Sequence, residues 1–423
     1  MTTTTSAAAP ASTIRPRGRL LPGDPVMRLL SWTTLVNAFG NGLFYTVSAL
    51  YFTRILGYGV GQVGVVLTVA GLCGVAASIP AGRAADRWGS KRVLIALVAA
   101  EGVGTIGYTL VHGLAAFALL ACVVTAVDRG TTTTRSALYA EVLTADQRVA
   151  GRAYLRAVTN VAMGLGSVLA GVTLQLDSRA AYQATVLADA LSFVLVALVL
   201  RRLPGRSAAA AAAADEAAAA PRAERRNPAL RDLPFLALTG LNAVLTLQFA
   251  MLEIGIPLWV VRDTHAPRFL VAAVMIVNTV LVVLFQVRAT KGTEEPRLAA
   301  RACLRGGLLL GAGCAVVGLA HGLPAVLASV VLVLGVVIEG GGEVLTQAGG
   351  WALSYDLAGD RAAGAYQGVY NAGMAAALMA GPALITLGVV GHGPLGWLAF
   401  GALFAAAGAA MGPVARWSQR VAG

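Results

Sequence analysis

Residues 82–92 read Gly-Arg-Ala-Ala-Asp-Arg-Trp-Gly-Ser-Lys-Arg and lie between two long apolar runs. The stretch combines an acid–base pair, Asp86-Arg87, with a glycine on each side and a basic pair after it. Glycine permits backbone turns that other residues resist, and basic residues prefer the cytoplasmic side of a membrane. The order of residues therefore predicts a tight, charged hairpin that joins two membrane-spanning helices on the cytoplasmic side.

The composition indicates a polytopic membrane protein. Of 423 residues, 57% are hydrophobic and 12% are charged, which is about half the charged share of a soluble domain. The apolar residues come in runs of about twenty or more, long enough to cross a hydrocarbon core of ~30 Å. The net charge of +12 resides mainly in short loops between these runs, so we expect contact with membrane lipid and not with nucleic acid.

Twelve apolar runs predict an all-α protein with twelve transmembrane helices. We place them at about 30–55, 60–81, 93–112, 114–138, 151–174, 181–201, 232–261, 267–289, 300–320, 323–346, 362–389 and 393–415. Of the 32 lysines and arginines, only Arg54, Arg179, Arg262 and Arg268 fall in loops on the outer side. This bias predicts a protein of the cell membrane with cytoplasmic N- and C-termini.

The chain divides into two halves that resemble each other. We expect a disordered cytoplasmic tail (1–26), a six-helix bundle (27–201), a low-complexity cytoplasmic linker (202–230), a second six-helix bundle (231–415) and a short cytoplasmic tail (416–423). His112-Gly113-Leu114 recurs as His321-Gly322-Leu323 at an offset of 209 residues. Repeated halves predict pseudo-symmetric bundles with a binding site between them near the bilayer midplane.

The stretch 82–92 resembles the loop between helices 2 and 3 of the major facilitator superfamily. That pattern is Gly, three residues, Asp-Arg, one residue, Gly, and two or three basic residues; it is matched here by Gly82, Asp86, Arg87, Gly89, Lys91 and Arg92. Ser90 departs from the usual first arginine. In that family the loop gates the inner mouth, and its aspartate holds neighbouring helix ends. The resemblance implies this role for Asp86.

Charged residues inside the predicted spans are candidates for proton coupling, because an ionised side chain at the bilayer centre is costly. Glu101 in the third span and Asp128 and Arg129 in the fourth lie at similar depths. We expect a Glu101–Arg129 or an Asp128–Arg129 pair, either as a static ion pair or as a proton-carrying carboxylate with Arg129 as its charge partner. Asp189 in the sixth span either takes part in this chemistry or pairs with a neighbouring helix.

The second half offers further carboxylates. Glu253 lies between Gln248 and Pro257, and a proline inside a helix predicts a kink of the type that lines transporter cavities. We expect Glu253 to bind a proton or a cationic substrate. Glu339 and Glu343 stand one turn apart in the tenth span, and Glu339, as the deeper of the two, is the preferred candidate.

Polar side chains in the spans are candidates for lining the cavity. Asn37, Asn41 and Tyr45 recur every four residues in the first span, so they share one helix face. They either line the cavity or form hydrogen bonds between helices. Gln248 and Asn371 are further cavity-lining candidates.

Small residues predict close helix packing. Gly166 and Gly171 belong to the fifth span, and Gly381-Pro382 to the eleventh. The fifth span also resembles a weakened form of the antiporter motif of facilitator drug exporters, in which Ser167 replaces proline.

The chain has no phosphate-binding Gly-Lys-Ser/Thr loop and no catalytic or metal-binding arrangement of residues, so we expect neither an enzyme nor a cofactor. Within the superfamily it resembles bacterial multidrug or secondary-metabolite exporters. That resemblance implies alternating access by a monomer, with proton-coupled export (antiport) of small amphipathic drugs or metabolites. The alternatives are a proton-coupled uptake symporter for a small metabolite and a non-transporting membrane protein on the same scaffold.

Overall fold

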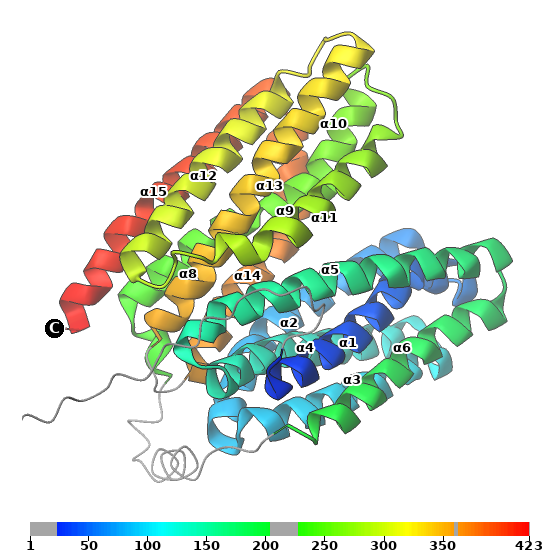
Figure 1. The fold of residues 1–423 in the computed structure, drawn as a ribbon. Coiled ribbons are helices and arrows are strands. Elements are labelled where there is room, and N and C mark those ends of the chain that lie inside the picture. Colours follow the sequence, from blue (N-terminus) through cyan, green and yellow to red (C-terminus); the bar gives the residue numbers. More distant parts are fainter. Residues whose placement is uncertain (1–22, 204–226, 359–362, 423) are drawn as a thin grey trace, which may run out of the picture.

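The computed structural model describes residues 23–203, 227–358 and 363–422, and within these ranges its elements are helical (Figure 1). The predicted N-terminal tail and linker fall largely at 1–22 and 204–226, outside the described residues, whereas the predicted C-terminal tail is helical up to residue 422. Ten of the described helices are long and apolar enough to cross a membrane. The first predicted span falls short of that limit because its polar face lowers its mean hydropathy, and the eighth contains an apolar helix at Ala273–Ala289.

The N-terminal half contains six membrane-spanning helices. They are α1 (Pro25–Leu50), which continues as the π-helical segment η1 (Tyr51–Ile55), α2 (Val60–Trp88), α3 (Ser90–Leu110), α4 (Leu114–Val142), α5 (Ala145–Leu176) and α6 (Arg179–Leu200).

The C-terminal half repeats this plan after the short helix η2 (Pro228–Leu230). Its first span is assembled from α8 (Leu233–Thr246), α9 (Gln248–Ala250), the π-helical η3 (Met251–Gly255) and α10 (Ile256–Arg262). The others are α11 (Leu270–Ala289), α12 (Pro296–Gly318), α13 (Ala325–Asp356), α14 (Ala363–Ile385) with the π-helical η4 (Thr386–Val390), and α15 (Pro394–Ala422).

The hairpin predicted at residues 82–92 is almost entirely helical. α2 runs to Trp88 and α3 starts at Ser90, so Gly89 alone makes the turn, with φ of 85°. The two helices are joined by a tight turn as predicted, but the turn is shorter than the stretch 82–92, because hydropathy marks where the chain leaves the hydrocarbon, whereas a helix continues until a residue breaks it. Gly89 is that residue, since its positive φ is accessible to glycine at little cost.

The repeat detected in the sequence is present in the backbone. Gly113 turns the chain between α3 and α4 with φ of 84°, and Gly322 turns it between α12 and α13 with φ of 70°. The two glycines thus perform the same turn at the same place in each half.

Three of the described spans contain a π-helical segment. One of these segments lies at the break that was predicted near Pro257. η3 interrupts the first span of the C-terminal half just before Pro257. η1 ends the first span of the chain, and η4 ends the span of α14. Each segment lies toward the end of its span that is remote from the linker.

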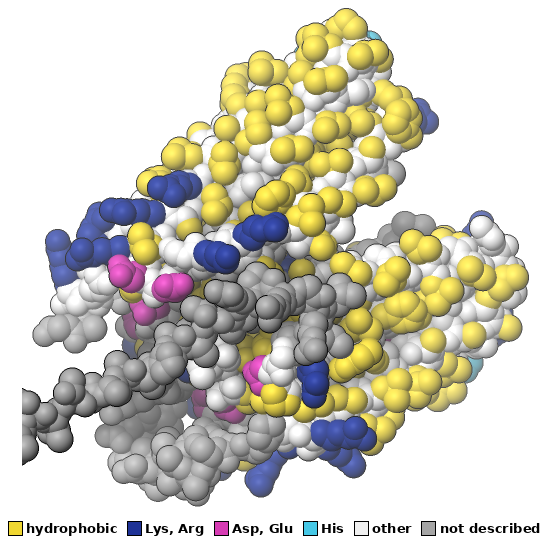
Figure 2. Space-filling model, in the orientation of Figure 1, with side chains coloured by type: hydrophobic (Ala, Val, Ile, Leu, Met, Phe, Trp, Pro, Cys, Tyr) yellow, Lys and Arg dark blue, Asp and Glu magenta, His cyan; other side chains and the backbone are white. Residues whose placement is uncertain are grey.

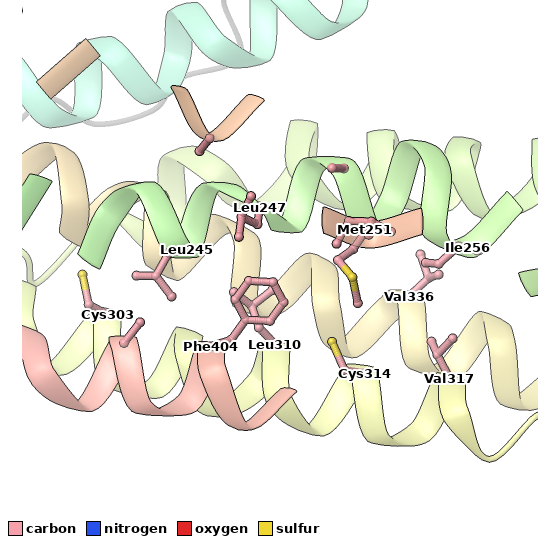
Figure 3. Close-up of a cluster of buried hydrophobic side chains, with 14 of the residues drawn as sticks. Leu245, Leu247, Met251, Ile256, Cys303, Leu310, Cys314, Val317, Val336 and Phe404 are labelled. Atoms are coloured by element: carbon pink, nitrogen blue, oxygen red, sulfur yellow. The ribbon is translucent and has the colours of Figure 1, made fainter. Parts of the chain in front are cut away.

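The two halves are packed differently. A continuous apolar core fills the C-terminal half (Figure 3). The core of the N-terminal half is split into two clusters, one around Leu94 and Phe193 and one around Tyr108 and Phe117. Polar side chains occupy the level between these clusters.

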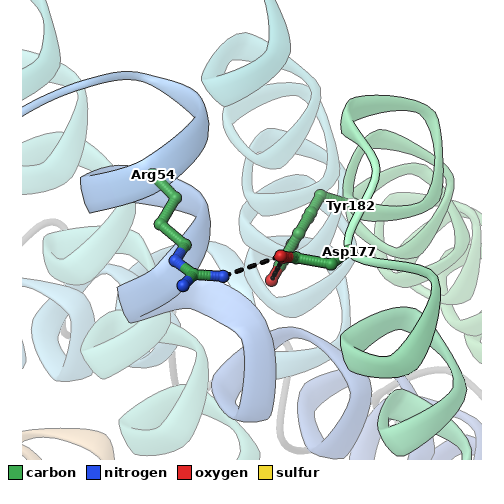
Figure 4. A network of polar contacts seen from close by, with 3 residues as sticks. All are labelled: Arg54, Asp177 and Tyr182. Carbon is green, nitrogen blue, oxygen red and sulfur yellow. Dashed lines mark hydrogen bonds and ion pairs between the residues drawn. The ribbon is translucent and has the colours of Figure 1, made fainter.

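The halves meet at the end of the molecule that carries the linker and the C-terminus, here called the linker end, and diverge toward the opposite, far end (Figures 1 and 2). At the linker end α2 lies against α14, where Gly82 contacts Gly364. At the far end the N-terminal half is held by its own contacts (Figure 4). There Arg54 Nη1 lies 2.7 Å from Asp177 Oδ2, and the Tyr182 hydroxyl donates to Asp177 Oδ1 at 3.0 Å.

Of the glycines predicted to pack helices, Gly166 does so and Gly171 does not. A Cβ on Gly166 would collide with the carbonyl oxygen of Phe39 in α1, whereas a Cβ on Gly171 would meet no atom within 4 Å. Five residues of helix amount to about 500°, which turns Gly171 to another face of α5. Gly381 packs like Gly166, because a Cβ there would lie 2.7 Å from the Cβ of Ala250.

We expect Gly166→Ala to destabilise the protein by about 1–3 kcal/mol, because α1 and α5 would have to separate. The matched change Gly171→Ala should be neutral or stabilising by up to ~1 kcal/mol, because alanine favours helix. Thermal unfolding of both variants in detergent measures this difference. Equal melting temperatures for the two would contradict the packing described here.

Candidate functional site

Asp86 connects the two halves at the linker end. Its Oδ1 and Oδ2 accept hydrogen bonds from the backbone N–H groups of Gly364 and Ala365, each at 2.7 Å. These groups open α14, where backbone donors lack intrahelical partners and the helix dipole favours a negative charge. Gly82 permits this approach, because a Cβ there would collide with the Gly364 carbonyl. The contact has the geometry implied for Asp86 by the resemblance.

The other residues of the matched pattern act within the N-terminal half. Lys91 Nζ donates to the carbonyl oxygens of Arg201, at 2.9 Å, and Leu203, so it ties α3 to the end of α6. The Ser90 hydroxyl donates to Glu141 Oε1 at 2.7 Å. The Arg87 guanidinium lies 5.6 Å from the Trp88 ring. Arg92 is exposed.

A second contact between the halves was not anticipated from the sequence. The Arg152 guanidinium on α5 lies over the rings of Trp351 and Tyr355 on α13, 5.0 and 5.7 Å from their centroids. It also donates to the Tyr355 hydroxyl at 3.1 Å, and that hydroxyl donates to the carbonyl of Ser136 on α4 at 3.4 Å. Arg152 stands at the predicted edge of the fifth span, where an arginine is easily assigned to the loop.

Carboxylates gather at the level where the N-terminal core is split. Glu101 is buried and accepts a hydrogen bond from the Thr131 hydroxyl at 3.1 Å. Asp189 is also buried, with the Ser192 hydroxyl 3.5 Å away. Asp128 Oδ2 lies 3.4 Å from Arg129 Nε. Of the two pairings left open by the sequence, the structure therefore contains Asp128–Arg129.

Arg135 adds a second cation to this cluster. Its Nη2 donates to Asn37 Oδ1 at 2.7 Å, and it acts electrostatically on Glu101. The amide nitrogen of Asn37 and the hydroxyls of Thr133 and Thr134 are buried without a hydrogen-bond partner among the described residues. Sequence reasoning missed Arg135, although an arginine inside the predicted span 114–138 was the available signal.

Exposure separates the members of the cluster into two groups. The side chains of Asp128 and Arg129 are 21% and 36% exposed, and Tyr45 is 52% exposed. Glu101 and Asp189 are only 5% and 1% exposed. All four charged groups act electrostatically on the Tyr45 hydroxyl, so the cluster has an exposed face and a buried interior.

Of this cluster, Arg129 borders a cavity of about 250 Å³ between the two halves. It is lined by Leu67, Thr68, Gly71, Thr125 and Arg129 of the N-terminal half, and by Ala375, Leu378 and Met379 of α14.

Arg156 belongs to α5 of the N-terminal half and lies against the C-terminal half. Its guanidinium lies 5.4 Å from the ring of Phe249, and it acts electrostatically on Glu253 and Glu343. Glu253 is exposed within η3. Glu343 is buried. An arginine of one half thus acts electrostatically on two carboxylates of the other.

Glu343 and Glu339 have different surroundings. Glu343 accepts hydrogen bonds from Asn278 Nδ2 at 3.2 Å and from Gln347 Nε2 at 2.9 Å. Glu339 faces α12, where the Cys314 thiol donates to its Oε1 at 3.4 Å. The sequence favoured Glu339, but the structure brings Glu343 close to Arg156.

A small pocket of about 10 Å³ with mixed polar and apolar lining lies beside Phe249 in the C-terminal half. It is lined by Asn242, Leu245, Thr246, Gln248, Phe249, Thr346, Gln347, Trp351, Tyr370 and Met374. Gln248 Oε1 is buried there without a hydrogen-bond partner among the described residues. Asn371 lies elsewhere, since its amide donates to the carbonyl of Gln367 in its own helix at 2.8 Å. Asn41 is half-buried.

A family model described as the Major Facilitator Superfamily matches residues 30–382. Three solved structures with the same fold have TM-scores of 0.62 to 0.71. The human organic anion transporter MFSD10 (TETRAN) is 14% identical (TM-score 0.69, covering 91% of this chain and 99% of that chain). A bacterial homologue of the iron transporter ferroportin in an outward-facing state is 13% identical (0.71, 94% and 100%). The proton:xylose symporter XylE is 13% identical (0.62, 90% and 94%).

At these identities the likeness concerns the fold alone. Comparison with curated protein sequences finds no match.

We expect Asp86→Asn to weaken the contact between the halves at the linker end, because a charge-assisted hydrogen bond contributes roughly 1.5–3 kcal/mol. The population open at the far end should fall. Introducing Thr68→Cys in the cavity wall allows this to be measured as the rate of labelling by a membrane-impermeant maleimide, with the parent lacking Thr68→Cys as background. We expect at least threefold slower labelling, and no change for Asp356→Asn, an exposed acid at the same end.

Proposed function

The chain belongs to the major facilitator superfamily and is a secondary transporter, and from this premise we propose that it exports small amphipathic drugs or metabolites in exchange for protons. The excess of lysine and arginine at the linker end supports a cytoplasmic linker end. In that orientation the structure is closed toward the cytoplasm and open toward the outside.

The observation that carries the proposal is the presence of a partly exposed and a buried carboxylate in one cluster of the N-terminal half. Asp128 is paired with Arg129, which lines the cavity, whereas Glu101 is buried and acts on the same Tyr45 hydroxyl. A proton from outside would reach Asp128 first and be held at Glu101. Burial of a charge without water is costly, so each protonation change alters which conformation of the halves is favoured.

The C-terminal half supplies the corresponding element for the substrate. Glu253 is exposed, and Arg156 of the opposite bundle acts electrostatically on it. A cationic amphipathic substrate that pairs with Glu253 would repel Arg156. A ligand shifts a conformational equilibrium only by its difference in affinity between two states, and this repulsion across the halves provides such a difference.

Everted membrane vesicles with an acidic lumen test the proposal. A panel of cationic and neutral drugs is added, and the luminal pH is followed for wild type, Glu101→Gln, Asp128→Asn and Glu253→Gln. If the protein exchanges drugs for protons, an active drug relieves the acidification. The variant that lacks the proton carrier should slow this by at least tenfold, because the exchange then has no titrating group.

Glu339→Gln is the matched control, because it also neutralises a buried carboxylate but one that faces α12. A loss of exchange in Glu339→Gln with retention in the other three would move proton coupling to Glu339. Absence of drug-dependent proton movement in wild type, with proton movement driven by a metabolite from the opposite face, would exclude export.

We expect Arg156→Gln to reduce transport at least tenfold while the protein remains folded, because Glu253 and Glu343 lose their shared cation. Arg156→Lys should retain part of the activity. In the double variant Arg156→Gln/Glu343→Gln the buried charge is removed together with its partner, so thermal stability should return toward wild type. Additive losses in the double variant would show that the two side chains act independently.

A proton-coupled uptake symporter is the second candidate, and the pocket beside Phe249 favours it. Its lining of amide, hydroxyl, aromatic and aliphatic groups is uncharged, and Gln248 Oε1 has no donor among the described residues. The pocket has a volume of about 10 Å³ in this conformation, so a hydroxylated metabolite would supply that donor only once the pocket widens. Proton uptake driven by sugars or polyols added on the outer face would identify this function, and Gln248→Leu should then weaken it.

A further inference from the structure

The linker end of the C-terminal half carries arginines that the proposed transport cycle does not use. Arg297, Arg301 and Arg305 recur every four residues in α12, so they share one face, and all three are exposed. Within the described part of the chain none of the three has an ion-pair or hydrogen-bond partner. We call this set the arginine stripe. Figure 2 shows basic side chains along this end of the half.

The face that carries the arginine stripe also faces lipid. Farther along α12 it continues with Leu308, which is 53% exposed, and Ala312, also exposed. The other faces of α12 are covered, because Gly306 packs against Thr346 of α13 and Gly307 against Phe404 of α15. The arginine stripe is therefore the linker-end part of a membrane-facing surface.

Arg305 lies deep enough in the membrane that its charge requires a partner. α12 has 23 residues and is about 35 Å long, against ~30 Å of hydrocarbon. With the helix centred in the membrane, the Arg305 Cα lies about 11 Å inside the hydrocarbon. Helical Cβ atoms tilt toward the N-terminus, which is the linker end for α12. The guanidinium of Arg305 therefore extends back toward the headgroups of that leaflet.

We infer that the arginine stripe binds the phosphate headgroup of an anionic phospholipid. A guanidinium matches a phosphate by two parallel hydrogen bonds, and three guanidiniums one turn apart present donors from the headgroup level down into the hydrocarbon. An acidic protein could reach Arg297 but not Arg305, so the depth favours lipid over a protein partner.

Two further observations favour a specific lipid site over the general excess of basic residues at the linker end. The offset of 209 residues between the halves matches Arg305 with Ala96 of α3, so the N-terminal half is built without this third arginine. Beside the start of α12, α15 ends with the exposed residues Arg416 and Arg420 and with Trp417, which is 41% exposed. Tryptophan is enriched at the level of lipid headgroups.

Native mass spectrometry of the full-length protein in detergent tests the inference. Phosphatidylglycerol and phosphatidylcholine with the same acyl chains are titrated separately, and the retained lipid molecules are counted. The triple variant Arg297→Gln/Arg301→Gln/Arg305→Gln is compared with Arg201→Gln/Arg202→Gln/Arg231→Gln, which removes the same charge from exposed positions at the same end. Glycerol phosphate added to wild type separates a lipid site from a site for free phosphate.

We expect wild type to retain phosphatidylglycerol in preference to phosphatidylcholine. Binding should weaken about fivefold for each arginine of the stripe that is removed, and the control triple variant should behave as wild type. Equal weakening in both triple variants, or displacement of the lipid by glycerol phosphate, would overturn the inference.

Single substitutions at exposed positions provide a second test, because they leave the packing of the helices unaltered. Arg305→Gln should weaken retention of phosphatidylglycerol about fivefold, and Arg262→Gln at the far end should not. Retention that is unaffected by Arg305→Gln would likewise overturn the inference, because the deepest arginine is the one whose position requires a lipid.

Discussion

The hydrogen bonds from the first turn of α14 to the Asp86 carboxylate determine how the rest of the molecule is arranged. They fix one half against the other at the linker end, and the far end opens as a consequence. Two charge-assisted bonds contribute a few kcal/mol, which is of the same order as the difference between conformers of a protein with two accessible states. The contact can therefore hold one conformation without preventing the other. Gly82 and Gly364 make it possible by leaving no side chain between the backbones.

Polar groups inside a membrane are costly, and the two halves meet this cost in different ways. The N-terminal half gives up a continuous core and places Glu101 and Asp189 between two apolar clusters, with Arg129 and Arg135 nearby. The C-terminal half keeps a continuous core and receives its cation from the opposite bundle, as Arg156. Charges that neutralise each other within one half move together when the halves rock. Charges that neutralise each other across the halves are separated by the same motion.

Much of the fold followed from local patterns in the sequence, whereas the partners across the halves did not. The charged stretch around Asp86 identified the family, and Pro257 located the break in its helix. Arg152 stands at the end of the predicted span 151–174 and Arg156 one turn farther in, a region where hydropathy cannot distinguish an arginine that faces the cytoplasm from one that points into the bundle. Glu339 and Glu343 share a face at one turn apart, so periodicity cannot choose between them. The choice depends on where Asn278 of α11 and Arg156 of α5 cross α13, which is a property of the assembled bundles.

The three π-helical segments have a consequence for how the cavity could close. A π-helical turn has already given up the regular ladder of hydrogen bonds, and helices kink most readily at such interruptions. Because η1, η3 and η4 all lie toward the far end, the tips of these helices can bend inward while the bundles below them keep their packing. Occlusion of a bound molecule then separates into two stages: local bending of the tips first seals the far end, and rocking of the whole halves follows. Bending at these segments would close the far end without moving the packed parts of the bundles.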